Sequence, residues 1–379
     1  MQFKKVIGQE EVKRGLVKAV QDNRISHAQL FFGPPGAGAL PLAIAYAQYI
    51  SCEKKADGDS CGMCTSCKQF ENLQYPDLHF SYPFVNTASK RVVSDDFAEQ
   101  WQKMLKETYY ADIHHWRSKV DAENKQLTFN VHEASNITKK IWLKSFTGNY
   151  KFVVIWLCEY MSVPTANKLL KSIEEPPDKT VFLMISENPE ALLATITSRT
   201  QSVKVHKLSD DDIRSALVLR DGVISNEKVE QLVQMADGNY FKAWLKLRQD
   251  EEDVHFEQFV QWMRICYKKD VTEIVKFSNE MHTTGRENIK EFLEFALFMV
   301  RQCIVGNYTQ GELSRFGPRE AEFASKFAPF INSGNIVQLS EFINQAYDDI
   351  SGNVYGKLVL TDLSLNMHKA LRRPVEQEA

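Results

Sequence analysis

Four of the seven cysteines in this 379-residue chain lie close together in the sequence. They are Cys52, Cys61, Cys64 and Cys67, with the spacing C-x8-C-x2-C-x2-C. Two residues between thiolates suit two ligands of one tetrahedral Zn²⁺, and four cysteines complete its coordination shell. The pattern therefore predicts a structural zinc module, because a complete shell leaves no position for a substrate. Free thiols or two disulfides are the alternatives, and a reducing cytosol disfavours the disulfides.

A second candidate site is the loop GPPGAGAL, which stands between a strand-like run and a helical stretch. A phosphate-binding loop has the form G-x-x-x-x-G-K-[ST] in that context: backbone N–H groups surround the phosphates, the lysine neutralises charge and the hydroxyl binds Mg²⁺. The glycines are present, as Gly33, Gly36 and Gly38. Ala39 and Leu40 stand in place of the lysine and the hydroxyl. The sequence predicts a degenerate loop that does not bind nucleotide; a plain loop of small residues is the alternative.

The acidic residues that such a site needs are missing as well. In ATP-hydrolysing proteins of this kind a later strand ends in acids that orient the metal ion and the attacking water. The corresponding strand here is followed by Trp156 and Leu157, and Glu159 comes too late to replace them. Loss of the cation, the hydroxyl and both acids predicts a site that does not hydrolyse ATP.

These residues are positioned by alternating strands and helices. The runs Gln29–Phe32, Phe152–Leu157 and Thr180–Ile185 are apolar throughout, which is typical of strands buried in a parallel sheet. Helical stretches follow at Leu42–Ile50 and Thr165–Glu175. Strand, helix and strand with short connections predict an α/β fold with a parallel sheet and right-handed crossovers.

After residue 207 the pattern becomes helical only. Ser209 precedes three aspartates and predicts a helix N-terminus, because acids favour the positive end of a helix. Phe292, Phe295, Met299 and Cys303 fall at helical spacing and predict a core-facing stripe. We expect three domains: an α/β domain at 1–207 with the cysteine module at 52–67, a small helical domain at 208–250 and a larger helical domain at 251–379. Residues 75–151 are polar and aromatic and contain no recognisable motif.

Composition excludes some classes of protein. Lys and Arg number 46 and Asp and Glu 49, for a net charge of −3, so the chain as a whole is no polyanion-binding surface. Ile25–Cys52 carries no formal charge, but its glycines and prolines would interrupt a membrane helix. The amino end is charged from the fourth residue, unlike a signal peptide. We therefore expect a cytoplasmic protein with no membrane segment.

Several stretches together resemble a known family. They are VIGQEEV at 6–12, SHAQLFFGPPGAG at 26–38, the cysteine module, ANKLLKSIEEPP at 166–177 and NPEALLATITSRTQ at 188–201. This combination resembles the delta-prime-type subunits of the bacterial DNA polymerase III clamp loader, which are AAA+ proteins. The motifs cover about residues 1–250, and the segment 82–131 is outside them. The resemblance implies an AAA+ phosphate-loop domain, a helical lid and an all-α collar that holds an oligomer together.

The resemblance also implies a role for an arginine. Clamp-loader subunits form an open ring, and the arginine of a Ser-Arg-Cys triplet reaches into the ATP site of the neighbouring subunit. The matching residues here are Ser198, Arg199 and Thr200, so Thr200 departs from the usual cysteine. A guanidinium suits this role because its planar fork neutralises charge that develops on a γ-phosphate. The family places a phosphate-sensing polar residue at Ser186 and a lid arginine near Lys242.

Together these observations predict a non-hydrolysing, stator-like structural subunit of the sliding-clamp loader, active in DNA replication. It would carry structural zinc, hydrolyse no ATP itself and supply Arg199 in trans. Its expected partners are the gamma/tau-type and delta-type subunits, with the sliding clamp and primed DNA reached through the assembled complex. Two other functions remain open: an ATP-hydrolysing subunit of the gamma/tau type with an unusual site, and a zinc-dependent nucleic-acid-binding module.

Overall fold

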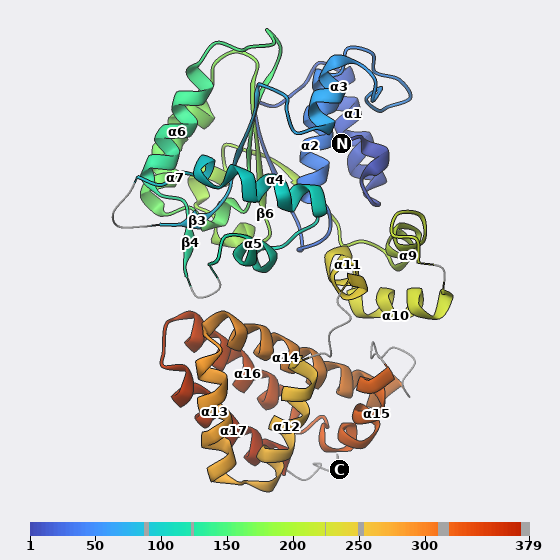
Figure 1. Ribbon diagram of the computed structural model, residues 1–379, viewed down its shortest axis with the longest axis vertical. Coiled ribbons are helices and arrows are strands. Elements are labelled where there is room, and N and C mark those ends of the chain that lie inside the picture. Colours follow the sequence, from blue (N-terminus) through green and yellow to red (C-terminus); the bar gives the residue numbers. More distant parts are fainter. Residues whose placement is uncertain (87–90, 123–124, 224, 249–253, 310–317, 373–379) are drawn as a thin grey trace. The chain divides into compact units, whose positions relative to one another are not determined.

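The computed structural model divides the chain into two compact units, Met1–Leu245 and Lys246–Ala379 (Figure 1). It describes residues 1–86, 91–122, 125–223, 225–248, 254–309 and 318–372. The expected boundary between residues 250 and 251 lies outside the described residues. The separation of 208–250 from 1–207 as a domain of its own stays a prediction.

The first unit is built on a parallel sheet with the strand order β2-β5-β6-β1-β7. The strands are β1 (Ala28–Phe32), β2 (Leu78–Ser81), β5 (Lys151–Ile155), β6 (Thr180–Ser186) and β7 (Gln201–Lys204). β5 and β6 are buried along their whole length, as expected for central strands with helices on both faces. The predicted α/β class with a parallel sheet is confirmed.

Helices cover the two faces of this sheet. On one face, α6 (Val131–Trp142) and α7 (Val163–Glu174) pack their apolar sides against β5 and β6, with Ile137 and Leu169 in the same buried cluster as Val153. On the other face lies α2 (Ala39–Ser51), whose Tyr46 ring is 6.4 Å from that of Phe31. α1 (Glu10–Gln21) packs on α2, and α3 (Thr65–Glu71) follows the cysteine loop.

The described residues of the segment 82–131, for which no motif was found, form a small substructure beside the sheet. Its elements are β3 (Phe84–Val85), η2 (Ser94–Phe97), α4 (Ala98–Glu107), α5 (Ile113–Lys119) and β4 (Leu127–Thr128), with β3 and β4 antiparallel. The Trp101 ring stacks on Tyr82 at 4.2 Å and lies 5.2 Å from Trp156 at the end of β5. Aromatic packing therefore holds this segment against the carboxyl end of the sheet.

Three helices complete the first unit: α9 (Asp210–Leu219), α10 (Asn226–Ala236) and α11 (Tyr240–Arg248), the last of which runs past residue 245. The Ser209 side chain accepts a hydrogen bond from the Asp212 N–H, and Asp212 bonds back to the Ser209 N–H. This capping box confirms the helix start that the sequence predicts. The short elements are η1 (Phe3–Lys5), η3 (Cys158–Tyr160), η4 (Pro189–Ala191) and α8 (Ala194–Thr197).

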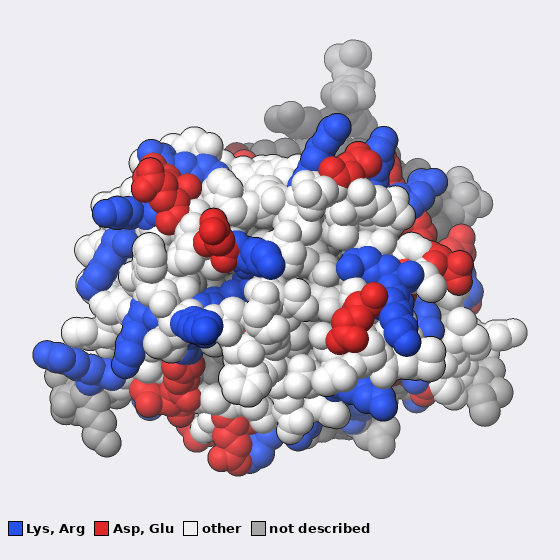
Figure 2. Space-filling model, turned by 90° about the horizontal axis from the view of Figure 1, so that it is seen from above, with Lys and Arg blue, Asp and Glu red and all other residues white. Residues whose placement is uncertain are grey.

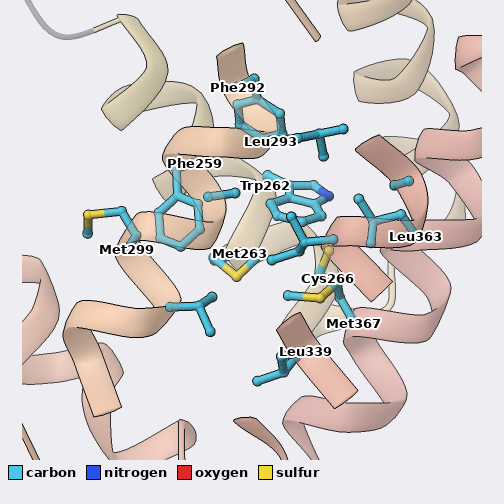
Figure 3. Close-up of a cluster of buried hydrophobic side chains, with 14 of the residues drawn as sticks. Phe259, Trp262, Met263, Cys266, Phe292, Leu293, Met299, Leu339, Leu363 and Met367 are labelled. Atoms are coloured by element: carbon cyan, nitrogen blue, oxygen red, sulfur yellow. The ribbon is translucent and has the colours of Figure 1, made fainter. Parts of the chain in front are cut away.

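The described elements of the second unit are all helices. They are α12 (Val254–Lys268), α13 (Val271–Thr283), α14 (Arg286–Thr309), α15 (Pro318–Phe327), η5 (Ala328–Phe330), α16 (Ile336–Ser351) and α17 (Gly356–Leu371). Trp262 lies at the centre of their core, surrounded by Phe259, Phe292 and Leu363 (Figure 3), and its indole N–H donates to the Ser364 hydroxyl at 2.8 Å. The predicted stripe on α14 belongs to this core. Of the helices described in either unit, none combines the length and apolar character of a membrane span.

Candidate functional site

The glycine loop lies between β1 and the N-terminus of α2, as predicted. Gly36 and Gly38 have positive φ angles of +70° and +98°, a backbone conformation that glycine adopts without a Cβ clash. Ala39 and Leu40 form the start of α2, and Leu40 is 3% exposed. The helix thus begins with a methyl and a packed isobutyl group where a nucleotide site needs a cation and a metal ligand.

Each glycine of the loop faces a group of this same chain at very short range. A Cβ on Gly33 would lie 2.2 Å from the Val205 carbonyl oxygen, and one on Gly36 would lie 1.8 Å from Asn239 Oδ1. At Gly38 the nearest atom to a Cβ would be Tyr110 Cε1, at 3.0 Å. The small residues are required here by close contacts with the protein itself.

Tyr110, between α4 and α5, contacts three other parts of the unit. Its hydroxyl accepts a hydrogen bond of 2.8 Å from the Ile7 N–H, and its ring lies 4.9 Å from that of Tyr240 in an edge-on arrangement. The Arg220 guanidinium lies 5.7 Å from the Tyr110 ring. Burial raises the pKa of Tyr110 to about 12, so the hydroxyl stays neutral.

Gln9, the residue before α1, connects the loop to the segment after β7. Its side-chain amide donates to the Ala37 carbonyl at 3.2 Å and to the His206 carbonyl at 2.5 Å, and its Oε1 accepts from the His206 N–H at 3.1 Å. The side chain thus satisfies backbone groups on both segments. Gln9 belongs to the stretch VIGQEEV, so a structural role of this motif is to hold the loop in place.

The residues after β5 are apolar and buried. Trp156 is 2% exposed, and its backbone N–H donates to the Ser81 carbonyl at 2.9 Å. Leu157 is fully buried and has a φ of +54°. Glu159 bonds to the residues that follow β6: its Oε1 accepts from the N–H groups of Glu187 and Asn188 at 2.9 and 3.2 Å. The two residues that directly follow β5 are therefore packed apolar side chains.

Glu159 and Glu187 form an acidic pair at the carboxyl ends of β5 and β6. Burial raises the pKa of both carboxyl groups, for Glu187 well above its ordinary value. The charges of Glu159 and Asp112 raise the pKa of Glu187 further, because like charges disfavour ionisation. Because the pKa values of both carboxyl groups are raised in the folded chain, we expect the stability of the fold to depend on pH.

Two further residues that the resemblance singles out have local roles. Ser186 is fully buried at the end of β6, where its hydroxyl accepts from the Asn188 N–H at 3.2 Å and its carbonyl accepts from the Gly33 N–H at 3.3 Å. The Lys242 N–H donates to Asn239 Oδ1 at 3.2 Å in the first turn of α11.

Arg199 follows α8 and is exposed on the surface of the first unit. Its Nε donates to Glu174 at the end of α7, and its Nη1 donates to the Thr195 carbonyl at 3.0 Å. Ser198, beside it, donates its hydroxyl to the same carbonyl at 3.3 Å. The ion pair with Glu174 lies at the surface, because the side chains of Arg199 and Glu174 are 36% and 40% exposed.

The four cysteines of the module meet in space. Cys52 ends α2, Cys61 lies in the loop, and Cys64 and Cys67 belong to the start of α3. Their sulfur atoms all lie within 4.8 Å of one another, and Cys61 Sγ is 3.9 Å from Cys67 Sγ. Zn–S bonds of about 2.3 Å in a tetrahedron separate the sulfurs by about 3.8 Å. The donor set and its spacing therefore fit one Zn²⁺.

The surroundings of Cys61 favour its thiolate. The N–H groups of Met63 and Cys64 point at Cys61 Sγ at 3.4 and 3.3 Å, and these bonds lower the pKa of the thiol to about 6. Thiolates are the form that binds a metal ion. The loop itself is tied to the amino end, because Asp59 accepts from the N–H groups of Phe3 and Lys4 at 2.9 and 3.0 Å.

The surface charges are mixed. Figure 2 shows Lys and Arg side chains interspersed with Asp and Glu on one face of the molecule. One basic residue of α6, Lys140, is engaged locally and donates to Asp95 at 2.5 Å. This mixed distribution agrees with the net charge of −3.

Sequence patterns identified the loop, the cysteines and the arginine, but they gave no role to the residues that pack against them. Tyr110, Asn239, Tyr240, Gln9 and Glu174 all act through contacts distant in sequence; the Ile7–Tyr110 bond, for example, spans 103 residues. Asn239 and Tyr240 carry a weak local signal, since Gly-Asn before a helical run suggests an N-terminal cap.

Comparison with known proteins gives one family match and several relatives. The model of the family described as "DNA polymerase III, delta subunit" matches residues 8–209, which is more than half of the chain. The chain is 27% identical over 241 residues to DNA polymerase III subunit tau of Escherichia coli, over 62% of this chain and 31% of that protein. It is 27% identical over 243 residues to subunit delta′ of Bacillus subtilis, over 64% of this chain and 60% of that protein.

The matches thus span between about a third and three fifths of the length of these curated relatives. Among solved structures, a DNA polymerase III gamma subunit-related protein of Thermotoga maritima overlaps 95% of this chain and 99% of its own, with a TM-score of 0.45 and 12% identity. The family match rests on the segment that contains the glycine loop, the cysteine module and Arg199. The chain therefore belongs to the DNA polymerase III delta subunit family, with delta-prime-type clamp-loader subunits among its relatives.

Proposed function

We propose that this chain is a non-hydrolysing, structural subunit of a bacterial DNA polymerase III clamp loader. In this role it joins gamma/tau-type and delta-type subunits in a ring and holds its place through the helices of the second unit, which act as a collar. The ring as a whole contacts the sliding clamp and primed DNA in the cytoplasm. The family match and the relatives named above support the assembly.

The observation that carries the non-hydrolysing role is the packing of the glycine loop. Asn239 and Tyr110 approach Gly36 and Gly38 so closely that a Cβ on either glycine would clash or crowd. A phosphate bound to the loop must approach the same backbone. Because Ala39 and Leu40 also offer neither cation nor hydroxyl, this loop has little to attract a nucleotide.

Arg199 is the residue that we propose acts on a neighbouring ATP site. It stands on an exposed turn, and its fork is anchored on one side by Glu174 and the Thr195 carbonyl. Anchoring reduces the side-chain entropy that is lost when a guanidinium docks on a phosphate. In the ring, Ser198 and Thr200 would set the geometry of this turn.

The cysteine module would hold one structural Zn²⁺, with Cys52, Cys61, Cys64 and Cys67 as its ligands. When bound, the ion supplies cross-linking of a polar loop that has few apolar residues to bury. The chain's own part is to present the thiolates, through the N–H groups around Cys61 and the ends of α2 and α3.

Reconstitution of the clamp loader with Arg199→Ala tests the proposal. The expected result is an intact complex whose DNA-stimulated ATP hydrolysis falls by about 10³-fold at the one affected site, the lower range for an arginine that acts in trans. If the remaining sites hydrolyse ATP independently, the total rate of hydrolysis falls by the share of the affected site.

Two variants act as controls. Arg199→Lys keeps the charge but lacks the planar fork, so the stimulation of ATP hydrolysis should be mostly lost in this variant as well. Arg24→Ala removes an exposed arginine elsewhere and should leave ATP hydrolysis unchanged. Unchanged hydrolysis in the Arg199→Ala complex would refute the role in trans. ATP turnover by the isolated chain would favour a gamma/tau-type ATPase instead, and tight binding of primed DNA by the isolated chain would favour a nucleic-acid-binding module.

A further inference from the structure

The space beside the glycine loop is filled by a side chain from the segment 82–131. Tyr110 is 3% exposed, although it stands in a connection between two helices. Its ring edge faces Gly38, at the N-terminus of α2, and its hydroxyl reaches the Ile7 N–H in the amino-terminal segment. A buried aromatic ring that bonds to a backbone donor next to a phosphate-type loop occupies a position suited to a ligand.

The walls around this ring have the chemistry of a binding site for a planar aromatic ring. Tyr240 meets the Tyr110 ring edge-on, at a centroid distance of 4.9 Å and an interplanar angle of 70°. The Arg220 guanidinium lies 5.7 Å from one ring and 6.0 Å from the other. Aromatic contacts, a cation over the rings and a backbone N–H donor are features that favour such a ring with one hydrogen-bond acceptor.

The walls are themselves held in place. The Tyr240 hydroxyl donates to Asp221 at 2.7 Å, and the Tyr240 N–H donates to the Gly36 carbonyl at 3.3 Å. The Thr108 hydroxyl accepts from the Tyr110 N–H at 3.1 Å, which fixes the turn that presents the ring. Tyr110 therefore connects the loop, the amino-terminal segment and the helices α9–α11 in one packed arrangement.

We propose that the space beside the glycine loop is a binding site for a planar aromatic ring with a hydrogen-bond acceptor, and that this chain occupies it permanently with its own Tyr110. The segment 82–131 thus supplies an internal ligand. Its ring joins α9–α11 to the loop without any bound nucleotide. This inference deepens the proposed function and rests on it, because it names what occupies the space beside the glycine loop and gives the segment 82–131 a role.

Tyr110→Gly removes the ring and opens the site in the full-length chain. The expected result is faster amide hydrogen exchange at Ile7, at residues 33–38 and in α9–α11, because each of these parts contacts the ring or its neighbours. The probe p-cresol reproduces the removed side chain. At millimolar concentration it should restore the protection in the variant and leave the wild-type chain unchanged.

A matched control is Tyr82→Ala, which removes another buried tyrosine of the same segment whose hydroxyl donates to the Ser94 carbonyl at 2.8 Å. Addition of p-cresol to this variant should not alter exchange at Ile7 or in the loop. Equal effects of p-cresol on both variants at these amides would overturn the proposal. So would a Tyr110→Gly protein that is folded and protected as in wild type, or one that p-cresol does not restore.

Tyr110→Phe provides a second test if the glycine variant does not fold. It keeps the ring and removes only the acceptor, so the chain stays folded while the Ile7 amide exchanges about tenfold faster, the usual effect of one lost hydrogen bond. Unchanged exchange at Ile7 would contradict the inference. These outcomes are separate from the proposed function, which fails if the wild-type chain hydrolyses ATP and stands if only the ring site fails.

Discussion

At the scale of the residue, burial sets the pKa of two carboxyl groups, Glu159 and Glu187, at the carboxyl ends of β5 and β6. Glu159 accepts two backbone N–H bonds, and Glu187 follows β6 in the same region. Burial raises the pKa of both groups, and the charge of Glu159 raises the pKa of Glu187 further. One oxygen of Glu159, Oε1, is therefore committed to backbone donors.

Replacement of Glu187 tests this pair through the pH dependence of stability. A carboxyl group with a raised folded-state pKa binds its proton more tightly in the folded chain, so its contribution is complete below the unfolded value of about 4.3 and is lost as pH rises through the folded value. Glu187→Gln should therefore raise the unfolding midpoint at pH 8 and leave it almost unchanged at pH 4.

Thermal unfolding of both proteins at the two pH values checks this expectation, with Glu190→Gln, an exposed neighbour, as the control. A Glu187→Gln variant that is destabilised at pH 8 but unchanged at pH 4 would contradict the expectation, because it would show that the charged carboxylate stabilises the folded chain.

At the scale of the element, short polar segments are held by their ends. The cysteine loop joins α2 to α3 and buries few apolar side chains, so its own burial contributes little to its stability. Its fixed points are the four sulfurs and the bonds of Asp59 to the amino end. A metal ion at the sulfurs would supply the missing cross-link.

Metal content and protease sensitivity test the module. Protein purified with reductant and without chelator should contain about one equivalent of zinc per chain. Cys64→Ser should lose most of this zinc, and the segment 52–67 should become the first site of protease cleavage.

Cys158→Ala removes a buried cysteine outside the module and should keep the zinc. Less than about half an equivalent of zinc in the unmodified protein would exclude the module as a stable zinc site under those conditions.

At the scale of the whole molecule, the described residues form a buried hydrophobic core in each of the two compact units. The first lies between the sheet and its helices, and the second lies within the helices after residue 246. Trp262 is fully buried in the second core, and its indole N–H donates to the Ser364 hydroxyl. Separate cores predict that damage to one unit leaves the other folded.

Trp262→Ala should lower the free energy of unfolding of the second unit by about 3–5 kcal/mol, because removal of a large buried ring leaves a cavity. Limited proteolysis should then release fragments from the second unit while residues 1–245 stay protected and keep their zinc. Loss of protection in both units together would show that the two cores unfold as one.

How far sequence reasoning reached depended on the range of the interactions. The runs 152–157 and 180–185 predicted β5 and β6 because burial on both faces leaves a continuous apolar stretch. The Ser209 cap was predictable because its partner Asp212 is three residues away. The segment 82–131 was not, since its order comes from rings such as Trp101 and Trp156 that meet across 55 positions.

The amino-acid sequence by itself determined which chemical groups this protein has. They are four thiols at metal-ligand spacing, the arginine Arg199 in a family motif, and a glycine loop with neither lysine nor hydroxyl. Only the tertiary structure decided what fills that loop. Tyr110 reaches Gly38, and Asn239 reaches Gly36, across 72 and 203 positions of the chain. Residue identity states which groups exist, whereas the approach of groups so distant in sequence depends on how the whole sheet and its helices pack.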